Sequence, residues 1–255
     1  NYNSLSDYGW LNDNKYLNNK FIEIVSGDIR DQNFCNNLTK GINKVFHFAA
    51  LIAIPHSYNS TESYIDTNIK GTFNICNAAK LSNVNKFFHI STSEVYGSAL
   101  YTPIDENHPF QAQSPYSATK ISADALALSF FYSYNFPLTV LRLFNTYGPR
   151  QSARAIIPTI ITQLLKNSKG ISLGNIKAIR DFNYVNDQCK IIYDLSNHRK
   201  LFGQTINIGS GLGISIESLL NKIFKISKKK RNIIKSKERL RPSNSEVSEL
   251  ICDNS

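Results

Sequence analysis

The chain has 255 residues, of which 42% are hydrophobic, so it can bury a full core in one large α/β domain or in two unequal ones. No apolar run reaches the roughly 18 residues of a membrane span, and the cysteines, Cys35, Cys76, Cys189 and Cys252, lack metal-ligand spacing, so we expect a cytoplasmic protein with reduced thiols, no membrane association and no bound metal. The formal net charge is +10, but the densest basic run, residues 228–231, has no interleaved aromatic residues and is typical of a solvated face. We therefore expect no nucleic-acid partner.

Short apolar runs alternate with segments of helical length in the first part of the chain. The runs lack polar alternation, as parallel strands covered on both faces do. They predict strands over residues 21–25, 44–48, 86–90 and 139–144. Helices are predicted over 62–82 and 115–134, and the second follows Ser114, a capping residue before a proline. The alternation predicts βαβ units and an α/β fold with a Rossmann-like, doubly wound parallel sheet.

The rhythm of the elements changes after residue 147. The elements predicted there are a helix over 155–167, strands over 171–174 and 182–185, a helix over 187–197, a strand over 205–208 and a helix over 215–226. This pattern is typical of a smaller, mixed α/β lobe. We therefore predict a first domain over residues 1–147 and a mainly substrate-binding domain over 148–255, in which 180–208 returns to the main sheet.

Tyr116 and Lys120 lie four residues apart in a predicted helix, which places both side chains on one face. An ammonium group near a phenol favours the phenolate, so Lys120 is expected to lower the pKa of Tyr116 and let it act as a base near neutral pH. On spacing alone, a Tyr and a Lys four residues apart are more often an ordinary surface or packing pair.

Polar and small residues follow the predicted strands at their carboxyl ends, where open α/β sheets bind ligands. In the run 91–97, Glu94 sits close to apolar residues, which is an unusual place for an idle carboxylate. The run 47–50 ends in two alanines, and such small residues let a ligand approach the backbone. Taken singly, each run is also explained as a strand end followed by a polar turn, with Thr92 as its cap.

Six motifs occur in a distinctive order: G-D-I-R-D (27–31), H-F-A-A (47–50), S-T-S-E-V-Y-G (91–97), Y-S-A-T-K (116–120), N-T-Y-G-P-R (145–150) and R-D-F-N-Y-V (180–185). Together they resemble the motif series of extended short-chain dehydrogenases/reductases, the NAD-dependent epimerase/dehydratase family that acts on sugar nucleotides. The resemblance covers essentially the whole chain. That family begins with a strand, a glycine-rich turn and a helix that hold the NAD pyrophosphate. The sequence has no such motif, and the expectation is that roughly 30 N-terminal residues, about one βαβ unit, are missing.

The resemblance implies a catalytic role for five residues. Tyr116 would accept the proton of the sugar hydroxyl at carbon 4, Lys120 would hold the nicotinamide ribose, and Thr92 would bind the sugar oxygen. In 4,6-dehydratases of this family the triplet is commonly Thr-Asp-Glu, and the Glu, here Glu94, removes the carbon 5 proton. Ser93 replaces the Asp that serves as general acid. Either Ser93 relays a proton through water or Glu94 performs both tasks.

The resemblance also implies binding residues and partners. The cofactor, NAD, would be held by Asp28, Ile29, Phe48, Ala49, Ala50, Tyr116 and Lys120. The nucleotide-sugar substrate would be held by Asn145, Arg154, Arg180, Asn207 and Arg241. Paired arginines suit a diphosphate. A homodimer through the two long predicted helices is a further expectation from the family.

Further runs narrow the resemblance: L-I-A-I-P-H-S-Y (51–58), Q-S-P-Y-S-A-T-K (113–120), Q-S-A-R-A-I-I-P (151–158) and R-L-R-P-S-N-S-E-V (239–247). They look like the nucleotide-N-acetylglucosamine 4,6-dehydratases of legionaminic acid (nonulosonate) biosynthesis. The implied reaction is 4,6-dehydration of UDP- or GDP-N-acetylglucosamine to the 4-keto-6-deoxy sugar. A UDP-glucuronate decarboxylase, which can also carry Thr-Ser-Glu, and a sugar-nucleotide 4-epimerase remain open. So does a non-catalytic nucleotide-binding protein.

Overall fold

A computed structural model of the chain describes residues 9–12, 18–166, 170–198, 200–236 and 240–255. Residue 167, the predicted end of a helix, and residue 239, the first of the run 239–247, lie outside the described residues. All four cysteines lie in the described part of the chain and are free thiols. No helix of that part combines the length and apolar character needed to cross a membrane.

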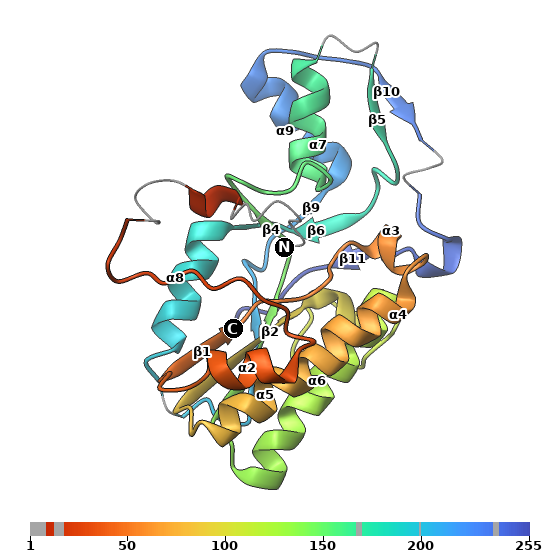
Figure 1. The fold of residues 1–255 in the computed structure, drawn as a ribbon. Helices are drawn as coiled ribbons and strands as arrows, with labels where there is room; N and C mark the ends of the chain where they lie inside the picture. The colour runs from red at the N-terminus through yellow and green to blue at the C-terminus, as the bar shows by residue number, and fades with distance from the viewer. Residues whose placement is uncertain (1–8, 13–17, 167–169, 199, 237–239) are drawn as a thin grey trace.

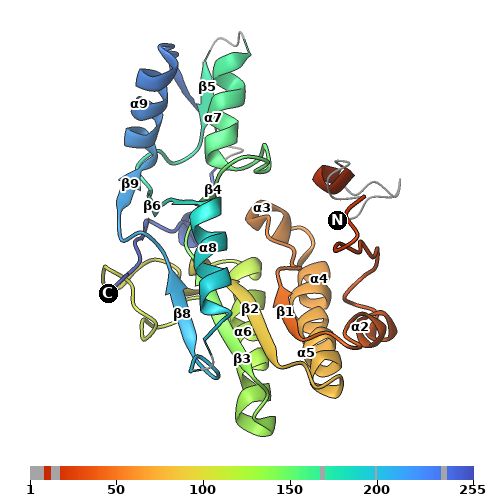
Figure 2. The same ribbon diagram turned by 90° about the vertical axis from the view of Figure 1, so that its left-hand side faces the viewer.

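The centre of the fold is a parallel sheet with the strand order β1-β2-β3-β8 (Figures 1 and 2). Its strands are β1 (Lys44–His47), β2 (Lys86–Thr92), β3 (Leu138–Leu143) and β8 (Thr205–Ile208). Four predicted strands are thereby confirmed. The fourth comes from late in the chain and pairs with β3 along the register Val140 opposite Thr205.

Helices cover both faces of this sheet, which confirms the predicted Rossmann-like architecture. One face is covered by α2 (Gln32–Leu38), α5 (Gly71–Leu81) and α6 (Pro115–Tyr134). Their core includes Ile75 and Phe130, packed around Phe87 of β2. On the other face, α8 (Val185–Leu195) places Ile192 in a cluster with Phe88. Because successive residues of β2 are buried on opposite faces, its sequence does not alternate between apolar and polar residues.

The predicted helix over 62–82 is a continuous helical segment of three parts, which follows the short helix α3 (Ile54–Ser57). The parts are α4 (Thr61–Tyr64), a π-helical turn (Ile65–Lys70) and α5. Asn68, in the π-helical turn, is 1% exposed. Its side chain pairs with the backbone of Leu51 at 2.8 and 3.0 Å and donates to the Thr119 hydroxyl at 3.0 Å. The wide turn therefore ties the segment after β1 to α6, as π-helical turns near functional sites often do.

A second group of elements stands apart from the main sheet at one end of the molecule (Figure 1). It consists of α7 (Ile156–Leu165), β5 (Ile171–Leu173), α9 (Ile216–Ser227) and β10 (Ile233–Lys235). Its core contains Ile160 of α7, Ile171 of β5 and Leu220 of α9. The predicted helices over 155–167 and 215–226 and the strand over 171–174 are confirmed within two residues at their described ends. The proposed division into two domains stays a prediction.

Short strands and turns connect the two groups. The strands are β4 (Thr146–Tyr147), β6 (Ile179–Asp181), β7 (Asn183–Tyr184), β9 (Gly213–Ser215) and β11 (Glu249–Leu250). Elsewhere in the described chain, 3₁₀ turns occur at Gly9–Asn12, Ser93–Tyr96 and Ser243–Ser245. The predicted strand over 182–185 differs from the structure. It is replaced by β6 and β7, and α8 begins at Val185, two residues before its predicted start.

The predicted strand over 21–25 is wrong. The segment is extended but pairs with no described strand, and Phe21 and Val25 are 85% and 50% exposed. A strand satisfies its backbone groups only through a neighbour. Among the described strands β1 pairs with β2 alone, so residues 21–25 form no ladder with the main sheet.

Candidate active site

The start of α6 fixes the position of the Tyr116–Lys120 pair. Ser114 and Ser117 form a capping box, in which each side-chain oxygen accepts a hydrogen bond from the other residue's backbone N–H at 3.1 Å. Pro115 occupies the first helical turn, where its missing N–H costs nothing. Tyr116 and Lys120 therefore lie on successive turns of one face, and they are 6% and 4% exposed.

The carboxyl end of β2 brings Thr92 and Glu94 to the same place. The Thr92 hydroxyl oxygen accepts a hydrogen bond from the backbone N–H of Glu94 at 3.2 Å and so begins the 3₁₀ turn. The Thr92 side chain also lies close enough to the Tyr116 hydroxyl to act on its pKa. Ser93 stands between Thr92 and Glu94 in the sequence and is 2% exposed. The fold thus gathers Thr92, Glu94 and Tyr116, which are up to 24 residues apart in sequence.

The expectation that Lys120 lowers the pKa of Tyr116 is wrong. Burial raises the pKa of Tyr116, the nearby Thr92 side chain opposes the rise, and the charge of Glu94 adds to it. Lys120 instead donates its Nζ hydrogen bond to the carbonyl oxygen of Ile90 at 2.8 Å. Burial lowers the pKa of Lys120 itself to about 8, against the opposing charge of Asp124.

Glu94 forms a two-pronged ion pair with Arg241, which comes from the C-terminal part of the chain. Nη1 of Arg241 lies 3.1 Å from Oε2 of Glu94, and Nη2 lies 3.2 Å from Oε1. The Glu94 side chain is 12% exposed and the Arg241 side chain is 22% exposed. Such a planar fork matches a carboxylate, and it would equally match a phosphate group.

Arg180 belongs to the same group of charges. It is 7% exposed, and its guanidinium donates to the carbonyl oxygens of Val247 and Ile179, both at 2.8 Å. Burial lowers the pKa of Arg180, and the charge of Glu94 opposes that change while the charge of Arg241 adds to it. Two predicted substrate ligands, Arg180 and Arg241, are therefore close to the predicted base.

Arg154 and Asn145 are two further residues predicted to bind the substrate. Arg154 is exposed in the loop before α7, and its charge acts on Tyr64, whose ring meets the Tyr116 ring edge to face at 6.3 Å. Asn145 follows β3 at its carboxyl end. Its Oδ1 atom is buried, and no described residue hydrogen-bonds to that atom. A polar atom of this kind is suited to a ligand.

Asn207 is placed differently from the other predicted substrate ligands. Its Oδ1 accepts a hydrogen bond from the Tyr96 hydroxyl at 2.7 Å, and its Nδ2 donates to the carbonyl oxygen of Ile104 at 3.2 Å. Both ends of the amide are engaged inside the protein. The structure therefore gives Asn207 two internal partners, and its role in binding the substrate stays a prediction.

The predicted cofactor residues lie along the carboxyl end of β1 and beside α2. Phe48 is 56% exposed and Ala49 is exposed, so the backbone there is open to a ligand. Asp28 lines a shallow hollow with Asp66 and Lys70, and its carboxylate forms a 2.7 Å ion pair with Arg30. Ile29 packs against the core under α5 and is half-buried. Ala50 is half-buried as well. Exposed small residues and a hollow with both acidic and basic side chains lie where the sequence predicts the cofactor.

Three buried polar residues of the site were not singled out from the sequence. They are His89 of β2, Asp124 of α6 and Arg142 of β3, which form a contact group behind Lys120. One signal was available, because Asp124 stands four residues after Lys120, as Lys120 does after Tyr116. His89 and Arg142 are scattered in the sequence and meet only through the pairing of β2 with β3.

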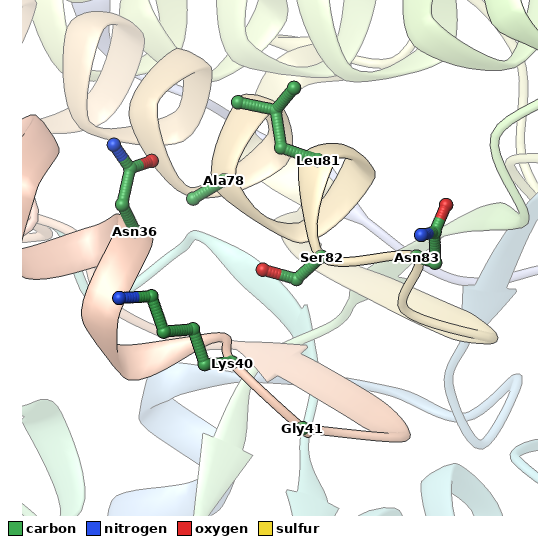
Figure 3. A pocket seen from close by; sticks show the side chains of 7 residues that line it. All are labelled: Asn36, Lys40, Gly41, Ala78, Leu81, Ser82 and Asn83. Carbon is green, nitrogen blue, oxygen red and sulfur yellow. The ribbon is translucent and has the colours of Figure 1, made fainter.

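A hollow on the surface lies away from this site (Figure 3). Its lining residues are Asn36, Lys40, Gly41, Ala78, Leu81, Ser82 and Asn83. Gly41 precedes β1 and Asn83 precedes β2, so the hollow is at the amino ends of the parallel strands. Thr92 and Ala49 lie at the carboxyl ends, where ligands bind in sheets of this type.

Comparisons with known proteins show the family of the chain. A family model described as GDP-mannose 4,6 dehydratase matches residues 2–255. The low-salt glycan biosynthesis protein Agl12 of Haloferax volcanii is 32% identical over 209 residues, or 82% of this chain and 67% of that protein. A dTDP-glucose 4,6-dehydratase of Streptomyces antibioticus is 34% identical over 198 residues, or 78% and 59%. The chain therefore spans less than two thirds of the length of the second relative.

Two solved structures have the same fold. DesIV, a dTDP-glucose 4,6-dehydratase from Streptomyces venezuelae with NAD and TYD bound, has a TM-score of 0.85 at 25% identity and covers 92% of this chain and 72% of its own. A UDP-glucuronic acid 4-epimerase from Bacillus cereus, in complex with UDP-glucuronic acid and NAD, has a TM-score of 0.86 at 28% identity, with 95% and 76% covered. The family model and these likenesses extend over the sheet, its helices and the second group of elements. The chain belongs to the GDP-mannose 4,6 dehydratase family, within the extended short-chain dehydrogenases/reductases.

Proposed function

We propose that the protein is an NAD-dependent 4,6-dehydratase of a nucleotide-linked sugar. The observation that carries this proposal is the position of Glu94, a carboxylate whose backbone N–H donates to the Thr92 hydroxyl and whose charge acts on Tyr116. A 4-epimerase needs no second base at this position, whereas a dehydratase has to remove a proton from carbon 5. The names of the relatives in Streptomyces support the same reaction class.

Each protein group has a defined task in this reaction. Tyr116 accepts the proton of the carbon 4 hydroxyl, and Thr92 holds the oxygen by a hydrogen bond. Lys120 supplies a positive charge beneath them. The residues around Phe48 and Ala49 would hold the nicotinamide end of NAD, and the chemistry that bound NAD supplies is reversible hydride transfer.

Glu94 is proposed to act twice, as base and then as acid. It takes the proton from carbon 5 and gives that proton to the departing carbon 6 hydroxyl, which leaves as water. Ser93 is buried, and a serine hydroxyl holds its proton too tightly to serve as the acid near neutral pH. Solvent then supplies the proton that returns to carbon 5, and the hydride removed from carbon 4 ends at carbon 6, so the net change is the loss of one water molecule.

Arg241 and Arg180 are proposed to bind the diphosphate of the substrate. Since Arg241 pairs with Glu94, a bound phosphate would take over one or both of the N–H groups that Arg241 now donates to that carboxylate. This exchange would free the carboxylate of Glu94 for proton transfer.

The sugar is proposed to be an N-acetylhexosamine, in UDP or GDP linkage, as in legionaminic-acid-type pathways. The support is the likeness of the runs 51–58, 113–120, 151–158 and 239–247. We also propose a homodimer through α5 and α6, which expose Phe73 and Tyr134 at 42% and 58%.

Product analysis tests the reaction. The full-length protein is incubated in deuterated water, separately with UDP-N-acetylglucosamine, GDP-N-acetylglucosamine, dTDP-glucose and UDP-glucuronate, and the products are read by mass spectrometry. We expect one hexosamine to lose water and to gain one solvent deuterium at carbon 5. Loss of water from dTDP-glucose alone would keep the reaction and correct the sugar. Loss of carbon dioxide from UDP-glucuronate, or an isomer without loss of mass, would contradict the dehydratase.

The variant Glu94→Gln tests the role of the carboxylate. Removal of a general acid–base lowers turnover by about 10²–10⁴-fold, and we expect that loss with the affinity for NAD unchanged. Glu62→Gln, at an exposed position of α4, is the matched control and should keep full turnover. Turnover of Glu94→Gln within a factor of a few of the unchanged protein would refute the assignment.

A further inference from the structure

Asp124 is a buried carboxylate to which the proposed reaction gives no task. It is 1% exposed and lies on α6 one turn beyond Lys120. Nε of Arg142 donates to its Oδ2 at 3.0 Å, and Nε2 of His89 lies 3.2 Å from its Oδ1. A charge in such a position is costly unless it is matched by partners.

Lys120 and Asp124 share one face of the helix, because residues four apart are neighbours on its surface. Lys120 also faces two histidines across the helix–sheet contact, His47 on β1 and His89 on β2, whose rings are 5.5 Å apart. Burial lowers the pKa of both histidines, so they are neutral near pH 7 and leave the charge on Lys120 unbalanced. The remaining ionisable neighbour on α6 is Tyr116, which is protonated.

Arg142 holds the carboxylate of Asp124 and is itself held from its other side. Its Nη1 donates to the Tyr96 hydroxyl at 2.9 Å, and that hydroxyl donates to Asn207 at 2.7 Å. Tyr96 is two residues after Glu94 in the same 3₁₀ turn. A chain of buried contacts therefore connects the helical turn of Lys120 with the turn that carries the proposed base.

We propose that Asp124 is a positioning residue of the active site, a buried anion one helical turn from Lys120 that keeps Lys120 charged, and that Arg142 orients the carboxylate of Asp124. Burial by itself would raise the pKa of Asp124, but His89, Arg142 and Lys120 together hold it below its usual value, so Asp124 is an anion at neutral pH. The consequence of this role of Asp124 for turnover rests on the proposed function, because the proposed reaction needs Lys120 as a cation.

The charge of Lys120 can be measured without any turnover. Lysines are labelled with ¹³C at Cε, the Lys120 signal is assigned by its absence in Lys120→Met, and its titration is followed by NMR. We expect a midpoint near pH 8 in the unchanged protein, as burial lowers the pKa of Lys120 to about 8. In Asp124→Asn the midpoint should fall by about one to three pH units, the usual effect of a close opposite charge.

Two controls separate charge from structure. Asp124→Glu keeps the charge and should restore the midpoint, and Asp187→Asn removes an exposed charge of α8 and should leave the midpoint unchanged.

Arg142→Gln is a second test with the opposite expected sign. Asp124 is then shared with one cation fewer, so the Lys120 midpoint should rise. If Asp124→Asn does not fold, Arg142→Gln provides the test. An unmoved midpoint in Asp124→Asn, or a lowered one in Arg142→Gln, overturns the proposal.

The pH profile of turnover extends the test to the reaction. Since Lys120 is needed as a cation, turnover should decline as the pH rises through the Lys120 midpoint, and Asp124→Asn should move that decline to lower pH. A purely structural role would lower turnover at every pH without moving the decline. If the proposed function fails, there is no turnover to profile, but the NMR midpoints still decide the role of Asp124.

Discussion

Lys120 is kept at a cost to stability. Its side chain is 4% exposed, and burial lowers its pKa from 10.5 to about 8. At pH 7 the amine is charged in both the folded and the unfolded protein, so the folded state carries the cost of desolvation. Between about pH 8 and 10.5 the folded protein releases the proton while the unfolded chain keeps it. The free energy of unfolding therefore rises with pH across that window.

Lys120→Met is accordingly expected to stabilise the protein. The gain at pH 7 should be about 1–3 kcal/mol, since the pKa difference is partly offset by the lost hydrogen bond to Ile90. It should shrink as the pH rises from 8 to 10.5. Urea unfolding at several pH values measures it, and Lys190→Met, at an exposed position of α8, should change stability by less than about 0.5 kcal/mol. A destabilised Lys120→Met at pH 7 would contradict this account.

At the scale of the element, the first turn of α6 both stabilises the helix and positions Tyr116, because Tyr116 lies between the capping residues Ser114 and Ser117. Ser114→Ala should lower the free energy of unfolding by about 1 kcal/mol and turnover by about tenfold or more, because small displacements of reacting groups are costly. Ser215→Ala removes the cap of α9, where Ser215 accepts from the Ser218 N–H at 3.1 Å. It should cost similar stability and leave turnover intact. Equal effects of both variants on turnover would show that the cap of α6 has no special role.

At the scale of the whole molecule, α5 and α6 leave aromatic rings at the surface that the fold itself does not cover. Phe73 of α5 and Tyr134 of α6 both contact Phe130, with ring centroids 6.3 and 5.6 Å apart. Phe73→Glu and Tyr134→Glu should each convert the proposed dimer to monomer in light-scattering chromatography, because a buried charge opposes association. Leu212→Glu, 74% exposed after β8, should leave the mass unchanged. A monomeric unchanged protein would refute the dimer.

Much of the fold follows from the order of residues alone. Strands buried on both faces, such as β2, lack polar alternation, and a capped start such as Ser114-Pro115 fixes where α6 begins. The Tyr116–Lys120 spacing is likewise a property of one helix, so it can be found by reading along the chain. Local rules fail where pairing decides. Residues 21–25 have the composition of a strand and lack a neighbour to pair with.

The sequence by itself determined the α/β alternation, the carboxyl-end motifs and the family to which they belong. Only the tertiary structure decided the charges around them. Whether Lys120 lowers the pKa of Tyr116, and whether Asn207 is free for a ligand, depends on burial and on partners far away in sequence. Arg241 reaches Glu94 across 147 residues, and Arg142 reaches Asp124 across 18. Such contacts act through space, because electrostatic and hydrogen-bond energies depend on distance and on exclusion of water, which the order of residues does not specify.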